Sequence, residues 1–258
     1  MSPSDIGWGG LAASLLLVVI AVALSWWQGL RLERSLLWAA ARASVQLLLV
    51  GSALAIVFQQ TVWLAWLWVA VMVVIAAFTV RHRAPEVPDA FVLALLANGT
   101  VAVVTLGIIF GLGIFPTTAQ AIIPIAGMQI GNAMAASIVV ARRIVAEMRD
   151  NRDEIEARLA LGHPWNDASK PYVRDAMRTA LLPQIESTKV VGLIALPGAM
   201  TGLILAGVSP ANAVKVQLAV MFLLLGSMAT SVTVIGLGLT RRLFTPDHRL
   251  IRLERAAR

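Results

Sequence analysis

Residues 122–140 read IIPIAGMQIGNAMAASIVV, an apolar stretch with a proline, two glycines, two amides and no charged residue. Gly127 and Gly131 form a G-x-x-x-G pattern, whose small face would let a second helix approach closely. Gln129 and Asn132 lie on roughly the opposite face of a helix when successive residues are placed about 100° apart. We therefore expect a membrane-spanning helix whose glycine face packs and whose amide face lines a transport pathway.

A second segment repeats this combination. Residues 188–206 read TKVVGLIALPGAMTGLILA, with Pro197 inside the apolar run and with Gly198 and Gly202 again four residues apart. Proline removes a backbone hydrogen bond, which a membrane tolerates where protein or a water-lined cavity satisfies the freed carbonyl. Pro124 and Pro197 thus predict two interrupted helices, which are typical of substrate paths in transporters. The alternative is a plain packing helix whose amides bond to neighbouring helices.

Composition places the chain in a membrane. Of its 258 residues, 59% are hydrophobic and 14% are charged, and the mean hydropathy is +0.81, whereas the apolar share of soluble domains is about 45–50%. This predicts an all-α polytopic membrane protein, with residues 1–258 forming one permease domain surrounded by lipid. The net charge of +7 does not indicate a nucleic-acid partner, because the basic residues lie between apolar runs. The sequence has no cysteine, which excludes disulfides and thiolate metal sites.

Seven apolar segments reach roughly the 20 residues that a helix needs to cross a bilayer. They are residues 6–28, 35–58, 62–80, 91–111, 119–141, 187–207 and 212–239. The connections 59–61, 112–118 and 208–211 contain no Lys or Arg, and the connections that alternate with them are basic. Because basic loops stay in the cytoplasm, we predict a protein of the bacterial inner membrane. Its N-terminus should lie on the outer side and its C-terminus on the cytoplasmic side.

Polar side chains are expected near the middle of several spans. A polar cluster at the midplane of an otherwise apolar protein is a transport-site hypothesis, although methionine commonly just fills apolar space. Sequence alone does not show that these side chains converge. The predicted substrate-pathway residues are Gln46, Asn98, Met128, Gln129, Asn132, Met200 and Thr201.

Residues 142–186 form the longest polar segment and follow the fifth span. Apolar positions spaced along residues 144–161 predict that the fifth helix continues into the cytoplasm. Gly162, His163 and Pro164 are expected to end it. A second short helix is expected from about Pro171 to Leu182, closed by Pro183. A charged hairpin of this size indicates a protein partner, and the alternative is a solvated loop.

The spans lack the residues of several other mechanisms. No Asp or Glu lies within any of them, and the three His residues fall in segments predicted to be cytoplasmic. An intramembrane hydrolase needs a base beside a nucleophile, and proton or sodium coupling normally needs a carboxylate. The chain also has no G-x-x-x-x-G-K-[ST] motif. We therefore expect no enzyme and no nucleotide site here, so that any energy source is another polypeptide.

Three stretches together resemble a known family. IPIAGMQIGNAM, EARLALGHPW and TKVVGLIALPGAMTGLILAGVSPANAVKVQLAVMF are similar to the FetB/YbbM-type permeases. These are membrane subunits of a small ABC exporter system associated with iron export and, in plant relatives, with aluminium tolerance. The resemblance covers nearly the whole chain. It implies a permease homodimer that pairs with a separate cytoplasmic ATPase, which binds ATP and Mg²⁺.

The resemblance also suggests how the ATPase is engaged. Glu156, Ala157 and Gly162 sit at the E-A-A-x-x-x-G spacing of the ABC importer coupling loop, although Arg158 replaces the second alanine. The closing L-x-P portion departs further, because residues 181–183 come later than that motif expects. The predicted coupling residues are Glu156, Ala157, Gly162, His163, Pro164 and Trp165, with Trp165 as the anchor in a partner's pocket or as a side chain at the lipid interface.

These observations favour the permease subunit of an ABC transporter, an exporter of a metal ion, with iron suggested by the resemblance. Two alternatives remain: an ion-coupled secondary carrier, and a membrane scaffold that recruits a soluble partner. No metal site can be assembled from these residues with a recognised geometry. An adjacent gene for a P-loop ATPase would favour the first reading.

Overall fold

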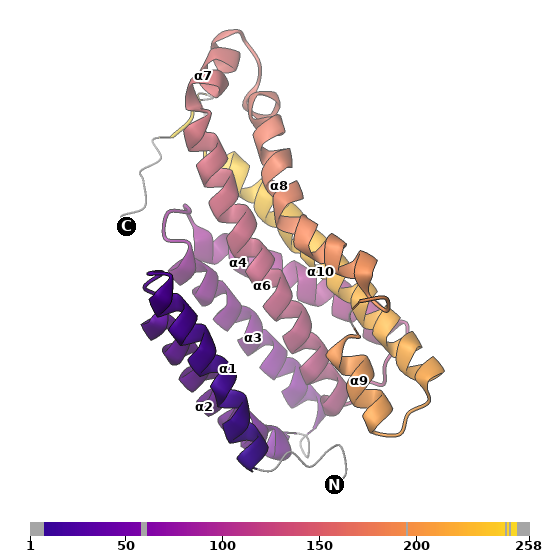
Figure 1. Cartoon of the computed structure of the whole chain (residues 1–258). Helices are drawn as coiled ribbons and strands as arrows, with labels where there is room; N and C mark the ends of the chain where they lie inside the picture. The colour runs from indigo at the N-terminus through magenta and orange to yellow at the C-terminus, as the bar shows by residue number, and fades with distance from the viewer. Residues whose placement is uncertain (1–7, 58–60, 195, 246, 248, 252–258) are drawn as a thin grey trace. The chain divides into compact units, whose positions relative to one another are not determined.

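The computed structural model describes residues 8–57, 61–194, 196–245, 247 and 249–251. Its helices are α1 (Trp8–Trp27), α2 (Glu33–Val57), α3 (Val62–Arg83), α4 (Ala90–Val101), the π-helix η1 (Ala102–Leu106), α5 (Gly107–Gly111), α6 (Ala119–Asp150), α7 (Arg152–Ala160), α8 (Trp165–Val190), α9 (Gly198–Leu205) and α10 (Pro210–Arg242) (Figure 1). An isolated antiparallel β-bridge joins Phe244 and Leu250. The expected all-α class is confirmed for the residues that the structure describes.

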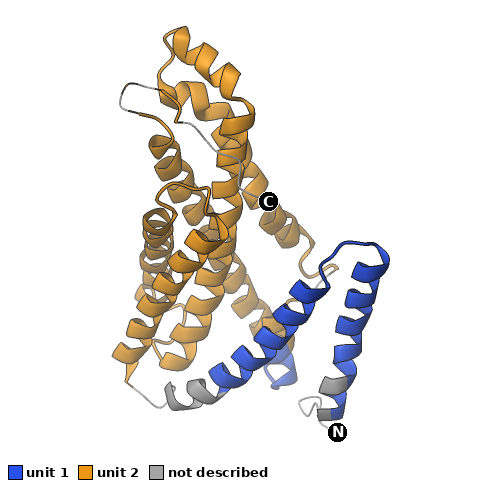
Figure 2. Cartoon of the chain, turned by 90° about the vertical axis from the view of Figure 1, so that its left-hand side faces the viewer, with its two compact units in different colours: residues 1–60, 202–208 blue, residues 61–201, 209–258 orange. Residues whose placement is uncertain are grey.

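Two compact units divide the chain (Figure 2). The first comprises residues 1–60 and 202–208, and the second comprises residues 61–201 and 209–258. Within the first, α1 and α2 form a helical hairpin, and its turn is held by Ser25. The Ser25 hydroxyl donates to Glu33 Oε1 over 3.0 Å and accepts from the Leu32 backbone N–H over 3.1 Å.

Helix α6 is the centre of the second unit, where it packs against α3, α4, α8 and α10 (Figure 1). A stripe that recurs with the helical period is buried along it. This stripe consists of Ile122, Ile125, Ala126, Gln129, Ile130, Ala133, Ala136, Ser137, Val140, Ala141 and Ile144. Its many alanines allow close neighbours on several sides, which explains why α6 and not a more apolar helix occupies the centre.

Two ion pairs gather the basic helix ends at one end of this unit. Arg142 Nε lies 2.8 Å from Glu86 Oε1, and Arg242 Nη1 lies 2.9 Å from Asp89 Oδ2. Both acids belong to the short connection between α3 and α4, next to the basic last turn of α3. The segments predicted to be cytoplasmic around residues 81–89, 142 and 242 therefore lie together, as alternating loops require, and their sidedness stays a prediction.

Four helical stretches among the described residues are long and apolar enough to cross a membrane. They are Val62–Arg83, Ala90–Gly111, Ala119–Asp150 and Pro210–Arg242. These correspond to the third, fourth, fifth and seventh predicted spans, and α1 and α2 lie on the first and second. The count of seven spans stays a prediction.

The sixth predicted span, 187–207, is not one helix. Its first residues end α8 at Val190, the described residues between there and Pro197 are outside any helix, and α9 begins at Gly198. The Thr201 backbone N–H and hydroxyl both bond to the Pro197 carbonyl, over 3.0 and 3.2 Å. Pro197 thus precedes the first turn of α9, a position where its missing N–H costs nothing.

Three other prolines leave their helices continuous. Pro124 lies inside α6, and Pro171 and Pro183 lie inside α8. The prediction of a short helix over 171–182 closed by Pro183 was therefore wrong, because α8 runs from Trp165 to Val190. One missing hydrogen bond did not outweigh the buried face of α8, which includes Tyr172, Val173, Ala176 and Ala180.

Candidate functional site

A pair of buried amides marks the interior of the second unit. Asn98 on α4 and Gln129 on α6 are both fully buried. Asn98 Nδ2 donates to the Ala94 carbonyl over 2.9 Å, and Gln129 Nε2 donates to the Val101 carbonyl over 3.5 Å. Each amide nitrogen thus donates one hydrogen bond. The Asn98 Oδ1 and Gln129 Oε1 atoms have no hydrogen-bond partner among the described residues.

The π-helix η1 begins directly after Val101, whose carbonyl accepts from Gln129. A π-helix shifts the backbone pattern from i+4 to i+5 donors and commonly occurs at functional sites. Thr105 Oγ1 also donates to the Val101 carbonyl, over 2.5 Å. One backbone carbonyl therefore collects two side-chain donors from η1 and α6, which fastens these elements together at the level of the amides.

Two unpaired amide oxygens inside an apolar bundle are costly, by about 1–3 kcal/mol for each buried acceptor left unsatisfied. Oxygen atoms of this kind accept hydrogen bonds from water or bind hard cations. The arrangement of Asn98 and Gln129 can therefore offer acceptors to a hydrated or dehydrated cation. Among the described residues no group of three or more His, Asp or Glu could hold a resident metal ion.

The other predicted pathway residues are more dispersed. Asn132 Nδ2 bonds within its own helix to the Met128 carbonyl, over 2.7 Å, and Met128 is 38% exposed. Thr201 is exposed on α9 and Met200 is half-buried. Gln46 is exposed on α2 in the other unit. The structure thus buries Asn98 and Gln129, whose amides bond to the Ala94 and Val101 carbonyls of α4. The convergence of the predicted pathway residues stays a prediction.

Within the second unit the buried face of α6 is the one that carries Gln129. Gln129 and Ala136 are buried, whereas Gly131 and Ala135 are exposed. A Cβ added to Gly131 would meet no described atom of this unit within 4 Å, and one added to Gly127 would meet only Met72 Cε, at 3.8 Å. A Cβ at Gly198 or Gly202 likewise meets nothing within 4 Å. Within this unit the alanine stripe makes the helix contacts, and the packing role of the glycines stays a prediction.

Sequence reasoning missed the closest polar contact between two spans. Ser137 Oγ on α6 and Ser231 Oγ on α10 are 2.6 Å apart, and Ser231 Oγ donates to the Ala133 carbonyl over 3.1 Å. Both serines are fully buried. The signal was present in the sequence, because Ser137 continues the small-residue face at Ala133 by one turn.

At the polar end, α7 closes with a turn that needs glycine. Gly162 has φ +88°, a left-handed conformation in which other residues are strained. The His163 N–H bonds to the Arg158 carbonyl over 3.1 Å, and the Gly162 N–H bonds to the Leu159 carbonyl over 3.0 Å. This is the Schellman pattern that ends helices. Pro164 then caps α8, and its carbonyl accepts from the backbone N–H groups of residues 167 and 168.

Trp165 does not project from this turn. It is half-buried and its ring lies 5.7 Å from that of Phe244, with an interplanar angle of 35°. The apolar residue that does project is Leu161, which is 80% exposed. Leu161, and not Trp165, is therefore the apolar side chain that this turn exposes. An apolar residue directly before the glycine of a polar loop was the available signal.

Ion pairs and hydrogen bonds stiffen the predicted coupling segment. Arg152 pairs with Glu156 over 2.7 Å and also donates to the carbonyls of Leu250 and Ile251, both over 3.2 Å. These contacts hold the start of α7 against the C-terminal segment. Ala157, His163 and Pro164 are exposed. The predicted coupling residues are thus exposed, except for the half-buried Trp165.

Comparison with known proteins places the chain in a family. Residues 8–244 match the uncharacterised protein family UPF0014. The chain belongs to this family. Its resemblance to the FetB/YbbM-type permeases is thereby confirmed, and no solved structure matches it.

Three UPF0014 relatives cover most of the chain. The UPF0014 membrane protein STAR2 of rice is 40% identical over 85% of this chain and 77% of its own length. The "Probable iron export permease protein FetB" of Escherichia coli is 36% identical over 93% of both chains. The Arabidopsis protein ALUMINUM SENSITIVE 3 is 36% identical over 85% of this chain and 81% of its own length. This UPF0014 chain is a multi-pass membrane protein.

Proposed function

We propose that the chain is the membrane-spanning permease subunit of an ABC transporter that exports a metal ion and is driven by a separate ATPase subunit. The name of the Escherichia coli relative, an iron export permease, supports the transport role and suggests iron as the substrate. The separate ATPase subunit, and not this chain, binds ATP and Mg²⁺ and hydrolyses the ATP. The permease acts as a homodimer in the inner membrane.

The observation that carries this proposal is the continuity of α6. The helix runs unbroken from Ala119 to Asp150, about 48 Å at 1.5 Å per residue. It holds Gln129 in the bundle interior and continues into α7 with one non-helical residue, Asn151, between them. A rigid helix with two arrangements can couple distant sites. A movement of α7 that the ATPase causes would thus be transmitted along α6 to the buried amides of Gln129 and Asn98.

The docking part is tested by changing Leu161. Leu161→Glu should leave the permease folded, because the side chain is 80% exposed, and should weaken co-purification of the ATPase encoded beside it at least tenfold. The matched control is Leu112→Glu, since Leu112 is 74% exposed in a connection at the predicted outer side. If both variants retain the ATPase equally, this turn is not the docking element.

The pathway part is tested by removing an amide. Gln129→Leu deletes one weak hydrogen bond, and membrane hydrogen bonds average about 0.6 kcal/mol, so the fold should survive. Efflux of Fe²⁺ from loaded vesicles that contain the reconstituted complex should fall to background while ATP hydrolysis persists. Asn132→Leu serves as the second test of the predicted pathway. Full efflux in both variants would refute the pathway assignment, and efflux without ATP would favour the ion-coupled carrier.

The homodimer is expected to use the open glycine face of α6. Gly131→Leu places a side chain where no described atom of this unit lies within 4 Å, so the monomer should fold. If a second copy packs there, the substitution should shift the detergent-solubilised protein from dimer to monomer in light scattering. A dimer that persists would show that the face is covered by lipid.

A further inference from the structure

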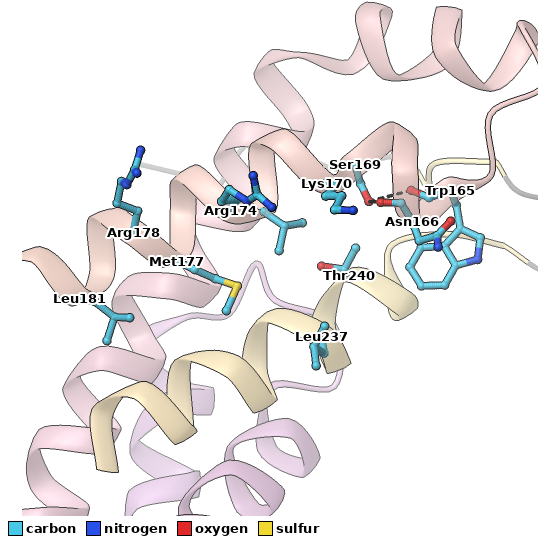
Figure 3. Close-up of a pocket in the computed structure, with 11 residues that line it drawn as sticks. Trp165, Asn166, Ser169, Lys170, Arg174, Met177, Arg178, Leu181, Leu237 and Thr240 are labelled. Carbon is cyan, nitrogen blue, oxygen red and sulfur yellow. Dashed lines mark hydrogen bonds between the residues drawn. The ribbon is translucent and has the colours of Figure 1, made fainter. Parts of the chain in front are cut away.

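A groove lies between α8 and α10, and Trp165, the first residue of α8, lines one end of it. It has a volume of about 460 Å³, within the range of small-molecule sites. Figure 3 shows it with α8 along one side and α10 along the other. Its floor is apolar and includes Val173, Met177 and Leu181 of α8 and Leu237 of α10.

The α8 side of the groove carries a row of cations. Lys170, Arg174 and Arg178 follow one another at intervals of four residues, and all three line the groove. Residues at this spacing share one face of a helix. In Figure 3 the Lys170 and Arg174 side chains lie beside the floor, whereas the Arg178 guanidinium is directed away from Leu237.

These cations lack ionic partners in the part of the chain that is described. None of the three belongs to an ion pair there. Asp167 and Asp175 lie on the same helix near Lys170 and Arg174, but form no ion pair with them. The groove therefore presents net positive charge above an apolar floor, which is a complementary surface for an amphiphile with an anionic head.

The position of the groove relative to the hydrocarbon boundary of the membrane indicates which amphiphile fits it. Leu237 is 67% exposed and lies in the last apolar turns of α10, a helix long and apolar enough to span a membrane. Arg241 and Arg242 follow in its last turn, where the chain leaves the hydrocarbon. The floor thus lies just inside the hydrocarbon boundary and the cations lie at headgroup level.

We propose that this groove binds an anionic phospholipid, with its phosphate at Lys170 and Arg174 and an acyl chain along Met177, Leu181 and Leu237. The cations supply the charge that a phosphodiester recognises, and lysine and arginine both bind phosphate well. The apolar floor gives part of one acyl chain a surface on the protein, so that this part packs against side chains and not against other lipids. A helix that belongs to the predicted coupling segment would then be held against α10 by lipid.

The test uses the full-length protein, stripped of lipid in a neutral detergent and titrated with phosphatidylglycerol or phosphatidylcholine by native mass spectrometry. The wild type should bind phosphatidylglycerol more tightly than phosphatidylcholine. The double variant Lys170→Gln/Arg174→Gln should lose this preference, at about fivefold for each charge removed. The matched control, Arg81→Gln/Arg83→Gln, removes two exposed cations from the end of α3 and should change the affinity less than twofold.

Three outcomes would overturn the proposal. An equal loss in both double variants would mean diffuse attraction to the whole basic end. Displacement of the lipid by excess inorganic phosphate would mean a phosphate site without a lipid. Unchanged lipid affinity together with lost ATPase co-purification would mean a protein docking surface. Leu237→Ser supplies an independent check, since it leaves every charge in place and should still weaken phosphatidylglycerol binding.

Discussion

At the scale of single residues, the α7–α8 hairpin contains an ionisable pair outside the spans. The Tyr172 hydroxyl beside Glu154 lowers the pKa of that carboxyl group, and the nearby Arg158 lowers it further. Burial raises the pKa of Tyr172, and the Glu154 carboxylate adds to this rise. A carboxyl group with a depressed pKa in the folded state stabilises the fold above its unfolded pKa of about 4.3 and loses that contribution as the pH falls through the folded pKa.

Removing the tyrosine hydroxyl should therefore have a pH-dependent effect. Tyr172→Phe should speed hydrogen exchange of the α7 amides at pH 7, where Glu154 is ionised, and should have a smaller effect at pH 3. The comparison of exchange rates at the two pH values is the measurement. Glu154→Gln provides the control, because it should remove the pH dependence of the difference. A Tyr172→Phe effect of equal size at both pH values would contradict an interaction between the Tyr172 hydroxyl and the ionised Glu154 carboxylate.

The serine pair between α6 and α10 gives a second prediction at this scale. Ser231→Ala removes the 2.6 Å contact with Ser137 and the 3.1 Å bond to the Ala133 carbonyl. It should reduce the free energy of unfolding by about 0.6–1.7 kcal/mol, the range of hydrogen bonds in membrane proteins. Ser227→Ala is the matched control, because Ser227 is as buried and bonds only to Leu224 in its own helix. Unfolding in mixed detergent micelles measures both variants.

At the scale of helices, glycines set the distance of α10 from its neighbours. A Cβ added to Gly238 would lie 2.7 Å from Leu93 Cδ2 of α4, and one added to Gly236 would lie 2.9 Å from Met177 Sδ of α8. The Met177 thioether can move, since Met is flexible, whereas Leu93 is 2% exposed and held by the core. The contact of α10 with α4 thus depends on Gly238.

Gly238→Ala should lower the free energy of unfolding by about 1–2 kcal/mol, because an overpacking cost of about 1–3 kcal/mol exceeds the gain in helix propensity. Gly226→Ala on the same helix is the control, since nothing lies within 4 Å of its added Cβ. The control should be neutral or slightly stabilising. Equal stability of the two variants would show that α4 and α10 separate without cost.

At the scale of the whole molecule, the ion pairs of Glu86 and Asp89 hold the basic ends of the helices together. They do not determine which side of the membrane these helix ends face. Introduced cysteines can decide this, because the sequence has none of its own. Cysteines at Arg83 and Asp167, both exposed, should be shielded from an impermeant thiol reagent in intact cells, and one at Thr117 should react. A cysteine at Arg255, which lies outside the described residues, should also be shielded. Reaction at Asp167 from outside would reverse the predicted orientation.

The sequence by itself determined the class, the approximate positions of the apolar helices, the continuation of the fifth helix past Arg142 and the turn at Gly162. These follow from composition and from short-range rules, because hydropathy and the left-handed preference of glycine do not depend on distant residues. The family was also recognisable from the stretches around residues 123–134, 156–165 and 188–222.

Tertiary structure decided which face of α6 packs, whether a proline ends a helix, and which side chains meet. Within the second unit α3, α4, α8 and α10 bury the alanine and Gln129 side of α6, and packing at Gly131 stays a prediction. Pro183 looked like a helix end, but burial of the α8 face outweighs one lost hydrogen bond. The meeting of Gln129 with Val101, of Ser137 with Ser231 and of Trp165 with Phe244 depends on how separate helices are arranged, and local patterns contain no information on that arrangement.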